Sequence, residues 1–579
     1  MVFGAIGFYL FLMCWLIIPA AAVGGIAALM DRLSGKENSG SWWAAVNRPI
    51  RLFPRRQARQ EASFQAWAQE HPIPAGPPRR FRWHWTVWLT IVAAPFFAAS
   101  FAAGLYSGWK IDRRLANAIA QAHADDPHWR FEDIIDRREF VPFEEDSALI
   151  VSEVLGMLPG SWPAGPPPQP GEPRPAPSAA LSVYERLDGL RPNIRLDDDT
   201  ADVLRAEMVE HSEAVALARS LADYERGSHE LDFTPDLLST SLEESQQSRI
   251  VARLLFADAA MRSHGGDPDG ALESCRAILG TGRSIGDETF LISNLVRYAI
   301  GGVARKAALR ALAQGEPSDA SLAALQADLL AEIDEPLLAR GFRWERGMHD
   351  EIYRRIRDGE LPIDALSSES GRRRTWKPNA IAPWGKLMFD SYRAAGLEWM
   401  NEAVAIADRP ARERPSLWKA WEAEIVRVRD SRFEKYGAVL PLLLTPAVDQ
   451  AEVADTRSRC ELATLVALLA AERHRRKTGE WPESIDAIGA EFLPRKPDDP
   501  YTGGPFRVSH RDGRYVVYSV GPNLADDGGE YDAKTWRKGG PDDNVAEAWD
   551  VALRGQPPGE HTMSPEDVGG ERTDPEQPE

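Results

Sequence analysis

The sequence predicts a mainly α-helical protein with two transmembrane helices, a helical ectodomain and a small α+β module near the C-terminus. Two long apolar segments without charge predict the membrane helices. Helix caps and apolar residues spaced three and four apart predict the helical ectodomain, and strand-like alternation is confined to about residues 506–520. A chain of 579 residues is long enough for two to four domains.

The membrane helices are predicted over residues 2–30 and 85–107, neither of which contains a charged side chain. Each segment exceeds the roughly 20 residues that a helix needs to cross the hydrocarbon core. Helix is the expected conformation because lipid offers the backbone no hydrogen-bond partners. The first segment differs from a cleaved signal peptide, since no Lys or Arg precedes it and it is longer than a signal core.

The segment between the two predicted helices, residues 31–84, carries ten Lys or Arg and four acidic side chains. The positive-inside rule places this basic loop in the cytoplasm and residues 108–579 on the extracytoplasmic side. We therefore expect a protein of the bacterial inner membrane, with the lipid bilayer as one partner. The basic loop also suits contact with anionic lipid or a cytoplasmic protein.

The negative charge of the predicted ectodomain argues against nucleic acid as a partner. The chain has a net charge of −19, and residues 31–84 contribute +6, which leaves −25 for residues 108–579. Such an acidic ectodomain is a poor nucleic-acid binder, because neutralising phosphates requires clustered Lys and Arg. Its two cysteines, Cys275 and Cys460, are expected as buried free thiols, with a single bridge between them as the alternative.

The ectodomain is expected to have five parts. Residues 108–158 form a membrane-proximal segment, and residues 159–181 form a linker that contains nine prolines and favours an extended polyproline conformation. A helical region, a terminal module and a disordered acidic tail then follow. These three parts cover residues 182–454, 455–536 and 537–579.

Within the helical region, Asp267 and Pro268 predict a helix start and Gly280 its end, and Ser318 predicts a second N-cap. The first of these helices, with the long helix after it, resembles a single tetratricopeptide-type hairpin. The sequence shows no regular recurrence at 34 residues.

The terminal module is predicted to contain a helix over Leu462–Arg475 and two strands, Phe506–Ser509 and Arg514–Val520. Asp512-Gly513 lies between the strands and suits a two-residue hairpin loop. In that register Val508 faces Val517.

The order of motifs in this module resembles the C-terminal half of the major pseudopilins of type II secretion. The matching residues are Trp481-Pro482, Asp499-Pro500-Tyr501, Tyr518-Ser519-Val520-Gly521 and Asp526-Asp527-Gly528-Gly529. The resemblance covers about 75 residues and implies a hairpin followed by a calcium-binding acidic loop. The chain lacks the prepilin cleavage motif and the single long pilin helix, so the resemblance does not imply pilus assembly. The whole chain is also similar to large bacterial membrane-anchored proteins that end in this way.

The acidic loop supplies the candidate metal ligands. Calcium prefers six to eight oxygen ligands, which carboxylates and carbonyls freed by glycine can provide. The alternative is a solvated acidic turn after a strand. The candidate ligands are Asn523, Asp526, Asp527, Glu530 and Asp532.

One pair of residues suits acid–base chemistry. Glu345 and His349 are four residues apart on a predicted helix and therefore share a face. The alternative is a solvated helix face crossed by ion pairs.

Three functions remain open from the sequence. The first is a non-enzymatic scaffold or interaction protein anchored in the membrane. The second is an envelope enzyme with its site near Glu345 and His349, and the third is a component of a secretion or envelope-assembly complex, with envelope proteins as partners.

Overall fold

The computed structural model describes residues 84–160, 162–163, 179–231, 233–234, 237, 240, 242–288, 290–362, 383–531 and 542–558. The chain forms two compact units that divide between Trp109 and Lys110. We refer to the described residues from Lys110 onward as the body. The described chain is mainly helical with one small antiparallel sheet, so the predicted fold class is confirmed at that level.

Helix α4, His84–Asp125, contains the segment predicted as the second membrane helix. Its helical conformation is confirmed. Among the described residues, no helix is both long and apolar enough to span a membrane. The first predicted span, residues 2–30, and nearly all of the basic loop 31–84 lie outside the described residues.

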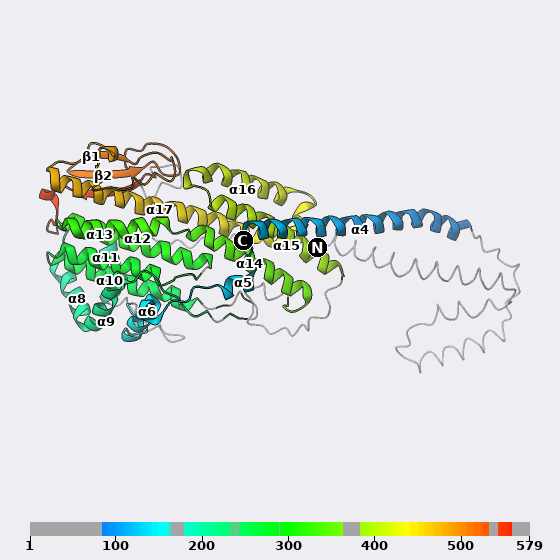
Figure 1. Ribbon diagram of the computed structural model, residues 1–579, viewed down its shortest axis with the longest axis horizontal. Helices are drawn as coiled ribbons and strands as arrows, with labels where there is room; N and C mark the ends of the chain where they lie inside the picture. The colour runs from blue at the N-terminus through cyan, green and yellow to red at the C-terminus, as the bar shows by residue number, and fades with distance from the viewer. Residues whose placement is uncertain are drawn as a thin grey trace, which may run out of the picture. The chain divides into compact units, whose positions relative to one another are not determined.

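The body is built from α-helices joined by short 3-10 turns (Figure 1). In chain order the α-helices are α5 Phe131–Asp136, α6 Ser147–Met157, α7 Ala179–Gly189, α8 Asp198–Glu210, α9 Ser212–Arg219, α10 Glu243–His264, α11 Pro268–Arg283, α12 Leu291–Gln314, α13 Asp319–Asp334, α14 Leu337–Asp358, α15 Pro383–Ala407, α16 Arg414–Asp430 and α17 Val439–Thr478. The 3-10 turns are η1 Phe143–Glu145, η2 Ser220–Asp223, η4 Ala411–Glu413, η5 Glu434–Gly437, η6 Ile485–Ala487 and η8 Val551–Leu553.

Two of the predicted caps are present. The Asp267 side chain accepts a hydrogen bond from Gly270 N at the start of α11, and Ser318 accepts one from Ser321 N at the start of α13. The predicted end of α11 at Gly280 is wrong, because the helix continues to Arg283. Gly280 is needed for packing, since a Cβ there would lie 1.9 Å from the Leu221 carbonyl oxygen.

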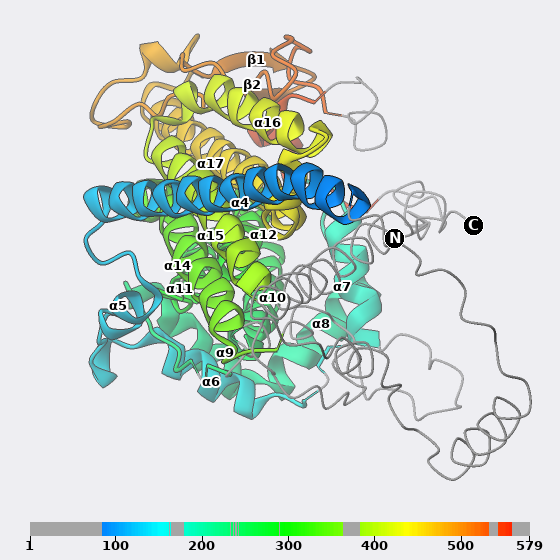
Figure 2. The same cartoon turned by 90° about the vertical axis from the view of Figure 1, so that its right-hand side faces the viewer.

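The largest hydrophobic core joins the helices to the sheet. It runs from α6 through α10, α11 and α12 to α17 and then to the inner face of the strands. Long helix α17 contacts α12 and α13 as well as β2 and β3, so it connects the helical layer with the sheet (Figure 1). Two further cores lie around α14, α15 and α16, and Figure 2 shows α14 and α15 side by side. Both Cys275 and Cys460 are free and buried in the largest core, as predicted.

The sheet consists of β1 Arg507–Arg511, β2 Arg514–Ser519 and β3 Asn544–Trp549, paired antiparallel in that order. Val508 pairs with Val517, as predicted. Asp512 and Gly513 form the two-residue loop, with φ angles of 53° and 69°. Positive φ at both positions belongs to the type I′ turn, which matches the twist of the strands and explains why Asp-Gly is used.

Strand β3 corrects the prediction of a disordered tail over residues 537–579. Residues 542–558 are ordered, and β3 pairs with β2 along its whole length. Ala546 and Ala548 are fully buried against the helices, so small apolar residues every second position supply the strand that a composition rich in Gly, Pro and Asp concealed. Residues 559–579 lie outside the described residues.

The Pro-rich linker also differs from its predicted bounds. Residues 179–181, assigned to the linker, form the first turn of α7. Residues 164–178, which hold most of the prolines, lie outside the described residues.

Candidate functional site

The predicted acid–base pair is present on α14. His349 Nε2 lies 3.2 Å from Glu345 Oε2, and each side chain is only 13% exposed. The second carboxylate oxygen of Glu345, Oε1, accepts a hydrogen bond of 3.3 Å from Leu291 N, the first amide of α12. Phe290, the N-cap residue of α12, makes no side-chain cap, so Glu345 caps this helix from a neighbouring one.

Burial moves the two groups' pKa values in opposite directions. It raises the pKa of Glu345 to about 7, against the smaller lowering effect of the Leu291 amide. It lowers the pKa of His349 to about 4. Between these values the carboxyl group keeps its proton and the imidazole is neutral, because the low-dielectric interior disfavours both charged forms. A carboxyl group with a pKa near neutrality has the acidity that general acid catalysis uses.

An acid–base pair can catalyse a reaction only if a substrate can reach it. Neither Glu345 nor His349 lines either of the two cavities described below. His349 stacks on Tyr353 with ring centroids 6.4 Å apart, and the Tyr353 hydroxyl is buried without a partner. The geometry is that of a buried polar contact between α14 and the start of α12.

Two further charged residues of α14 are buried in contacts with other helices. Arg346 is 1% exposed and donates to Asp125 and Asn401, which joins α14 to α4 and α15. Asp350 receives two hydrogen bonds, of 2.8 and 3.0 Å, from Arg393 of α15. The helix therefore carries both kinds of ion pair: Asp350–Arg393 is buried, whereas Arg343–Asp408 is about one-third exposed.

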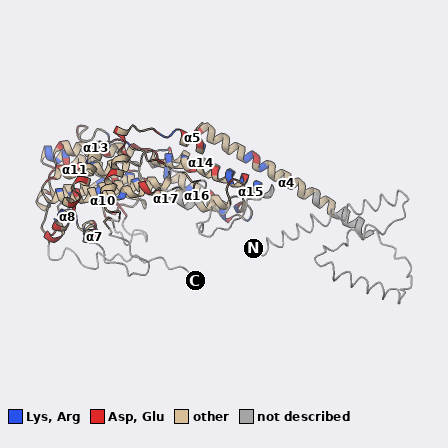
Figure 3. Cartoon of the chain, turned by 90° about the horizontal axis from the view of Figure 1, so that it is seen from below, with Lys and Arg blue, Asp and Glu red and all other residues tan. Residues whose placement is uncertain are grey.

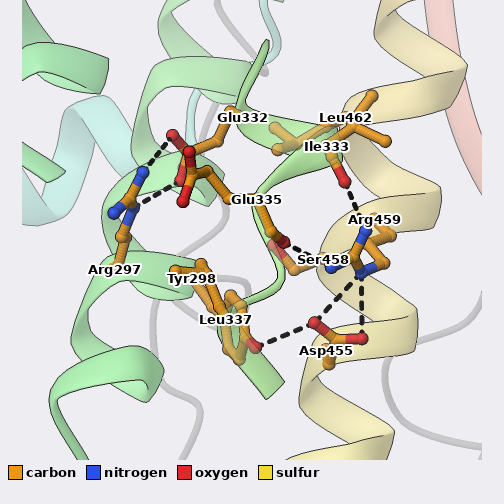
Figure 4. Close-up of a pocket in the computed structure, with 11 residues that line it drawn as sticks. Arg297, Tyr298, Glu332, Ile333, Glu335, Leu337, Asp455, Ser458, Arg459 and Leu462 are labelled. Atoms are coloured by element: carbon orange, nitrogen blue, oxygen red, sulfur yellow. Dashed lines mark hydrogen bonds and ion pairs between the residues drawn. The ribbon is translucent and has the colours of Figure 1, made fainter. Parts of the chain in front are cut away.

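A second cluster surrounds Asp455 on α17, which is fully buried (Figure 4). Its Oδ1 accepts a hydrogen bond of 2.8 Å from the Tyr298 hydroxyl, and its Oδ2 accepts one of 2.8 Å from Arg414. Arg459, one turn further along α17, approaches both oxygens and also donates to the carbonyls of Ile333 and Glu335. Four segments distant in sequence thus meet at one carboxylate.

The cavity beside Asp455 is about 10 Å³, close to the lower limit for a single water molecule. Arg297 and Glu332 form a second buried ion pair on its wall, with N–O distances of 2.7 and 2.8 Å. Proximity to the Asp455 carboxylate and burial raise the pKa of Tyr298 well above its ordinary value, with burial the larger cause. The space is too small for a substrate, and the cluster fixes the relative positions of α12, α13, α16 and α17.

The larger cavity, of about 280 Å³, lies between α6 and α10. His229 and Glu244 line it, and His229 Nδ1 lies 2.9 Å from Glu244 Oε2. The other ring nitrogen, Nε2, has no hydrogen-bond partner and is inaccessible to solvent. Because Nε2 is covered, it is not presented to the cavity, and this nitrogen cannot act there as a base without moving the ring.

The predicted calcium ligands do not converge as a set. Asp526 forms an ion pair with Arg507 and accepts from the Tyr518 hydroxyl at 3.2 Å. Glu530 lies 3.6 Å from Arg511. Asn523 donates to Asp527 Oδ2 at 3.3 Å, and Asp532 lies outside the described residues.

Among the described residues of the predicted set, only Asp527 belongs to a cluster of carboxylates. Its carboxylate, with those of Asp542 and Asp543, offers three oxygens within 4.8 Å of one another. The loop after β2 and the residues before β3 meet here: Asp542 N donates to Asp527 Oδ2, and Gly529 N donates to Asp543 Oδ2 at 2.6 Å. Gly521 allows this approach, since a Cβ there would lie 2.4 Å from the Asp542 carbonyl oxygen.

These carboxylates fit a hard cation. Burial, followed by repulsion from Asp527, raises the pKa of Asp542. Burial and the neighbouring aspartates also raise the pKa of Asp543, against the lowering effect of two backbone amides. Asp542 Oδ1 is buried without a hydrogen-bond partner. A divalent cation would relieve both the repulsion and the missing contact.

Sequence reasoning found Asp527 and missed Asp542 and Asp543. The latter lie in the segment interpreted as a disordered tail, and only the pairing of β3 with β2 brings them to the loop. The signal that could have identified the strand is a period of two: Ala546 and Ala548 alternate with the larger residues Val545, Glu547 and Trp549.

Comparisons of the chain with protein-family models, with curated proteins and with solved structures gave no match.

Proposed function

We propose that this protein is a membrane-anchored interaction protein, in which residues N-terminal to Lys110 hold the body at the bilayer. The charge-free segments 2–30 and 85–107 support the anchor. In the second of these, Phe101, Leu105 and Tyr106 are all more than half exposed, as suits side chains in contact with lipid.

One observation on the body carries the interaction function. Phe140 and Phe143, which flank Pro142 between α5 and α6, are 83% and 78% exposed. Aromatic side chains are enriched where protein partners dock, because they bury a large area with few rotatable bonds. Two such rings on one short segment indicate a contact site for another envelope protein.

Site-specific photocrosslinking in cells tests this function. A crosslinker at position 140 or 143 should capture a defined protein partner, whereas the same group at Val209, which is 69% exposed on α8, should capture none. Equal capture from Val209 and position 140 would contradict a specific interface. Phe140→Ala with Phe143→Ala should abolish the partner's co-purification and leave the melting temperature unchanged, since the rings support no core.

The anchor gives a topology that labelling can check. Two crossings would place the basic loop in the cytoplasm and the body outside. In a Cys14→Ser background, with Cys275 and Cys460 buried, an impermeant maleimide should label Val209→Cys in intact cells and should not label Ala62→Cys. Labelling of Ala62→Cys without Val209→Cys would reverse the topology, and equal labelling of both would rule out two crossings.

A second function is favoured by the carboxylate cluster: calcium binding that fastens β3 to the acidic loop. Millimolar calcium should raise the melting temperature of the full-length protein, and Asp527→Asn with Asp543→Asn should remove the increase. Asp512→Asn is the matched control, since Asp512 lies in the exposed hairpin turn. An unchanged melting temperature, or the same increase in both variants, would refute calcium binding at this cluster.

A further inference from the structure

A group of large apolar side chains lies exposed around η5 and the start of α17. Phe433 and Leu443 are 76% and 70% exposed, and Tyr436 is 65% exposed. Val439 and Met388 are also exposed. We call these five residues, together with Arg432 and Lys435, the η5 patch.

The η5 patch is basic although the chain as a whole is acidic. Residues 427–436 contain four basic and two acidic side chains, in a protein with a net charge of −19. The Arg432 guanidinium lies 5.7 Å from the Phe433 ring centre, and the Lys435 ammonium lies 5.6 Å from that of Tyr436. Within the described part of the chain neither cation has a carboxylate partner, so both charges remain available.

The position of the η5 patch follows from contacts along α15. Arg114 of α4 binds Glu398, and the Ala118 carbonyl accepts from Asn401, so α4 and α15 run parallel within the body. The Ser391 hydroxyl donates to the Gly437 carbonyl at the end of η5. Ser391 precedes Glu398 by two turns, which places η5 toward the end of the body where the chain enters at Lys110. In Figure 3, positions coloured as Lys or Arg lie on α4 and beside α15 at this end.

We propose that the η5 patch rests on an anionic lipid surface, with its aromatic and aliphatic side chains among the headgroups and its cations against lipid phosphates. This inference depends on the proposed membrane anchor, because the segment that precedes Lys110 would bring this end of the body to the bilayer. Exposed aromatic rings next to Lys and Arg are the composition of interfacial contacts, in which rings insert at the headgroup level.

Charge complementarity selects lipid over the other occupants of an apolar surface. A second copy of this acidic chain would bring like charges to most of the contact, and only its own η5 patch would face the first one. Each basic residue near an anionic membrane strengthens binding by about fivefold, so two unpaired cations favour anionic over neutral lipid by roughly 30-fold.

A fluorescence experiment on the full-length protein tests the proposal. In the Cys14→Ser background, an environment-sensitive dye is attached at Tyr436→Cys or, as a control, at Val209→Cys on α8, which lies at the opposite end of the body from α15 (Figure 1). The protein is reconstituted into phosphatidylcholine vesicles with or without about one-third phosphatidylglycerol. Lipids that carry a headgroup spin label report contact by quenching.

We expect strong quenching at position 436 in vesicles that contain phosphatidylglycerol, weaker quenching in pure phosphatidylcholine and none at position 209. Arg432→Gln with Lys435→Gln should remove the dependence on phosphatidylglycerol. Equal quenching at positions 436 and 209, or quenching that ignores lipid charge, would overturn the proposal. A dye signal at 436 that rises with protein density in the vesicle and shows no quenching would indicate a second copy instead and would equally refute lipid contact.

Flotation of the same samples separates the two proposals. Protein that floats with the vesicles but lacks quenching at position 436 would contradict only the η5 patch. Protein that fails to float would contradict the membrane anchor itself.

Discussion

The buried pair on α14 predicts an unusual pH dependence of stability that single substitutions should reveal. In the folded protein burial raises the pKa of Glu345 from 4.5 to about 7 and lowers that of His349 from 6.5 to about 4. Glu345→Gln and His349→Gln each remove one titrating group and retain a polar side chain. Gln at position 345 can still accept the hydrogen bond from Leu291 N.

The two groups act with opposite sign. Glu345 has a raised folded pKa, so its contribution to stability is complete below about 4.5 and is lost as the pH rises through about 7. His349 has a lowered folded pKa, so its contribution is present above about 6.5 and is lost as the pH falls through about 4. Each shift corresponds to about 3 kcal/mol. Over most of the window between pH 4.5 and 6.5 the two slopes cancel in the wild-type protein.

Urea unfolding of the wild type and both variants at several pH values measures this. Relative to wild type, Glu345→Gln should gain about 3 kcal/mol as the pH rises from 4.5 to 7, and His349→Gln should lose about the same amount between pH 4 and 6.5. Subtracting the wild-type curve removes the contribution of every other titrating group. Curves for both variants that stay parallel to wild type would refute the reasoning, because the two groups would then titrate as in the unfolded chain.

Two further predictions concern packing. Asp455→Asn leaves Arg414 and Arg459 facing a neutral amide inside the body and should lower the free energy of unfolding by about 3–5 kcal/mol. The same change at exposed Asp430 should lower it by less than about 0.5 kcal/mol. Similar losses for both variants in urea unfolding would contradict the buried network. Gly286→Ala should reduce the melting temperature more than Gly359→Ala, although both glycines have positive φ, because a Cβ at 286 would lie 1.9 Å from a carbonyl oxygen and one at 359 meets open space. The positive φ costs about 1–2 kcal/mol in both variants and the clash adds about 1–3 kcal/mol in the first, so equal shifts would argue against the close approach.

Features that depend on neighbouring residues could be predicted from the sequence. The caps at Asp267 and Ser318 and the Asp512-Gly513 hairpin each follow from chemistry within four residues. The Glu345–His349 contact belongs to the same class, because helical spacing alone brings the two side chains together.

Features that depend on pairing over long distances could not be predicted in this way. Strand β3 is stable because β2 supplies its hydrogen bonds and α17 covers its alanines, and neither fact is visible in a segment rich in Gly and Asp. The acidic cluster has the same origin, since Asp527 and Asp542 meet only after β3 is in place. The burial of Glu345 and His349 likewise depends on α12, which determines whether their pKa values shift at all.

Ion pairs between elements of the body fix how the packed helices are aligned along their axes. Five contacts between different elements of the body each include one carboxylate and one guanidinium. These pairs are Arg219–Asp258, Arg297–Glu332, Arg393–Asp350, Arg414–Asp455 and Arg554–Glu472.

Alanine- and leucine-rich faces pack almost as well after a slip of one turn, about 5.4 Å, because their ridges repeat. The same slip would separate these charges from their partners, at a cost of several kcal/mol for each ion that stays buried. A buried pair adds little to stability when it is formed, yet it strongly penalises each misaligned arrangement. The buried charges of α14 and α17 therefore select among packings that the apolar residues alone would leave nearly equivalent.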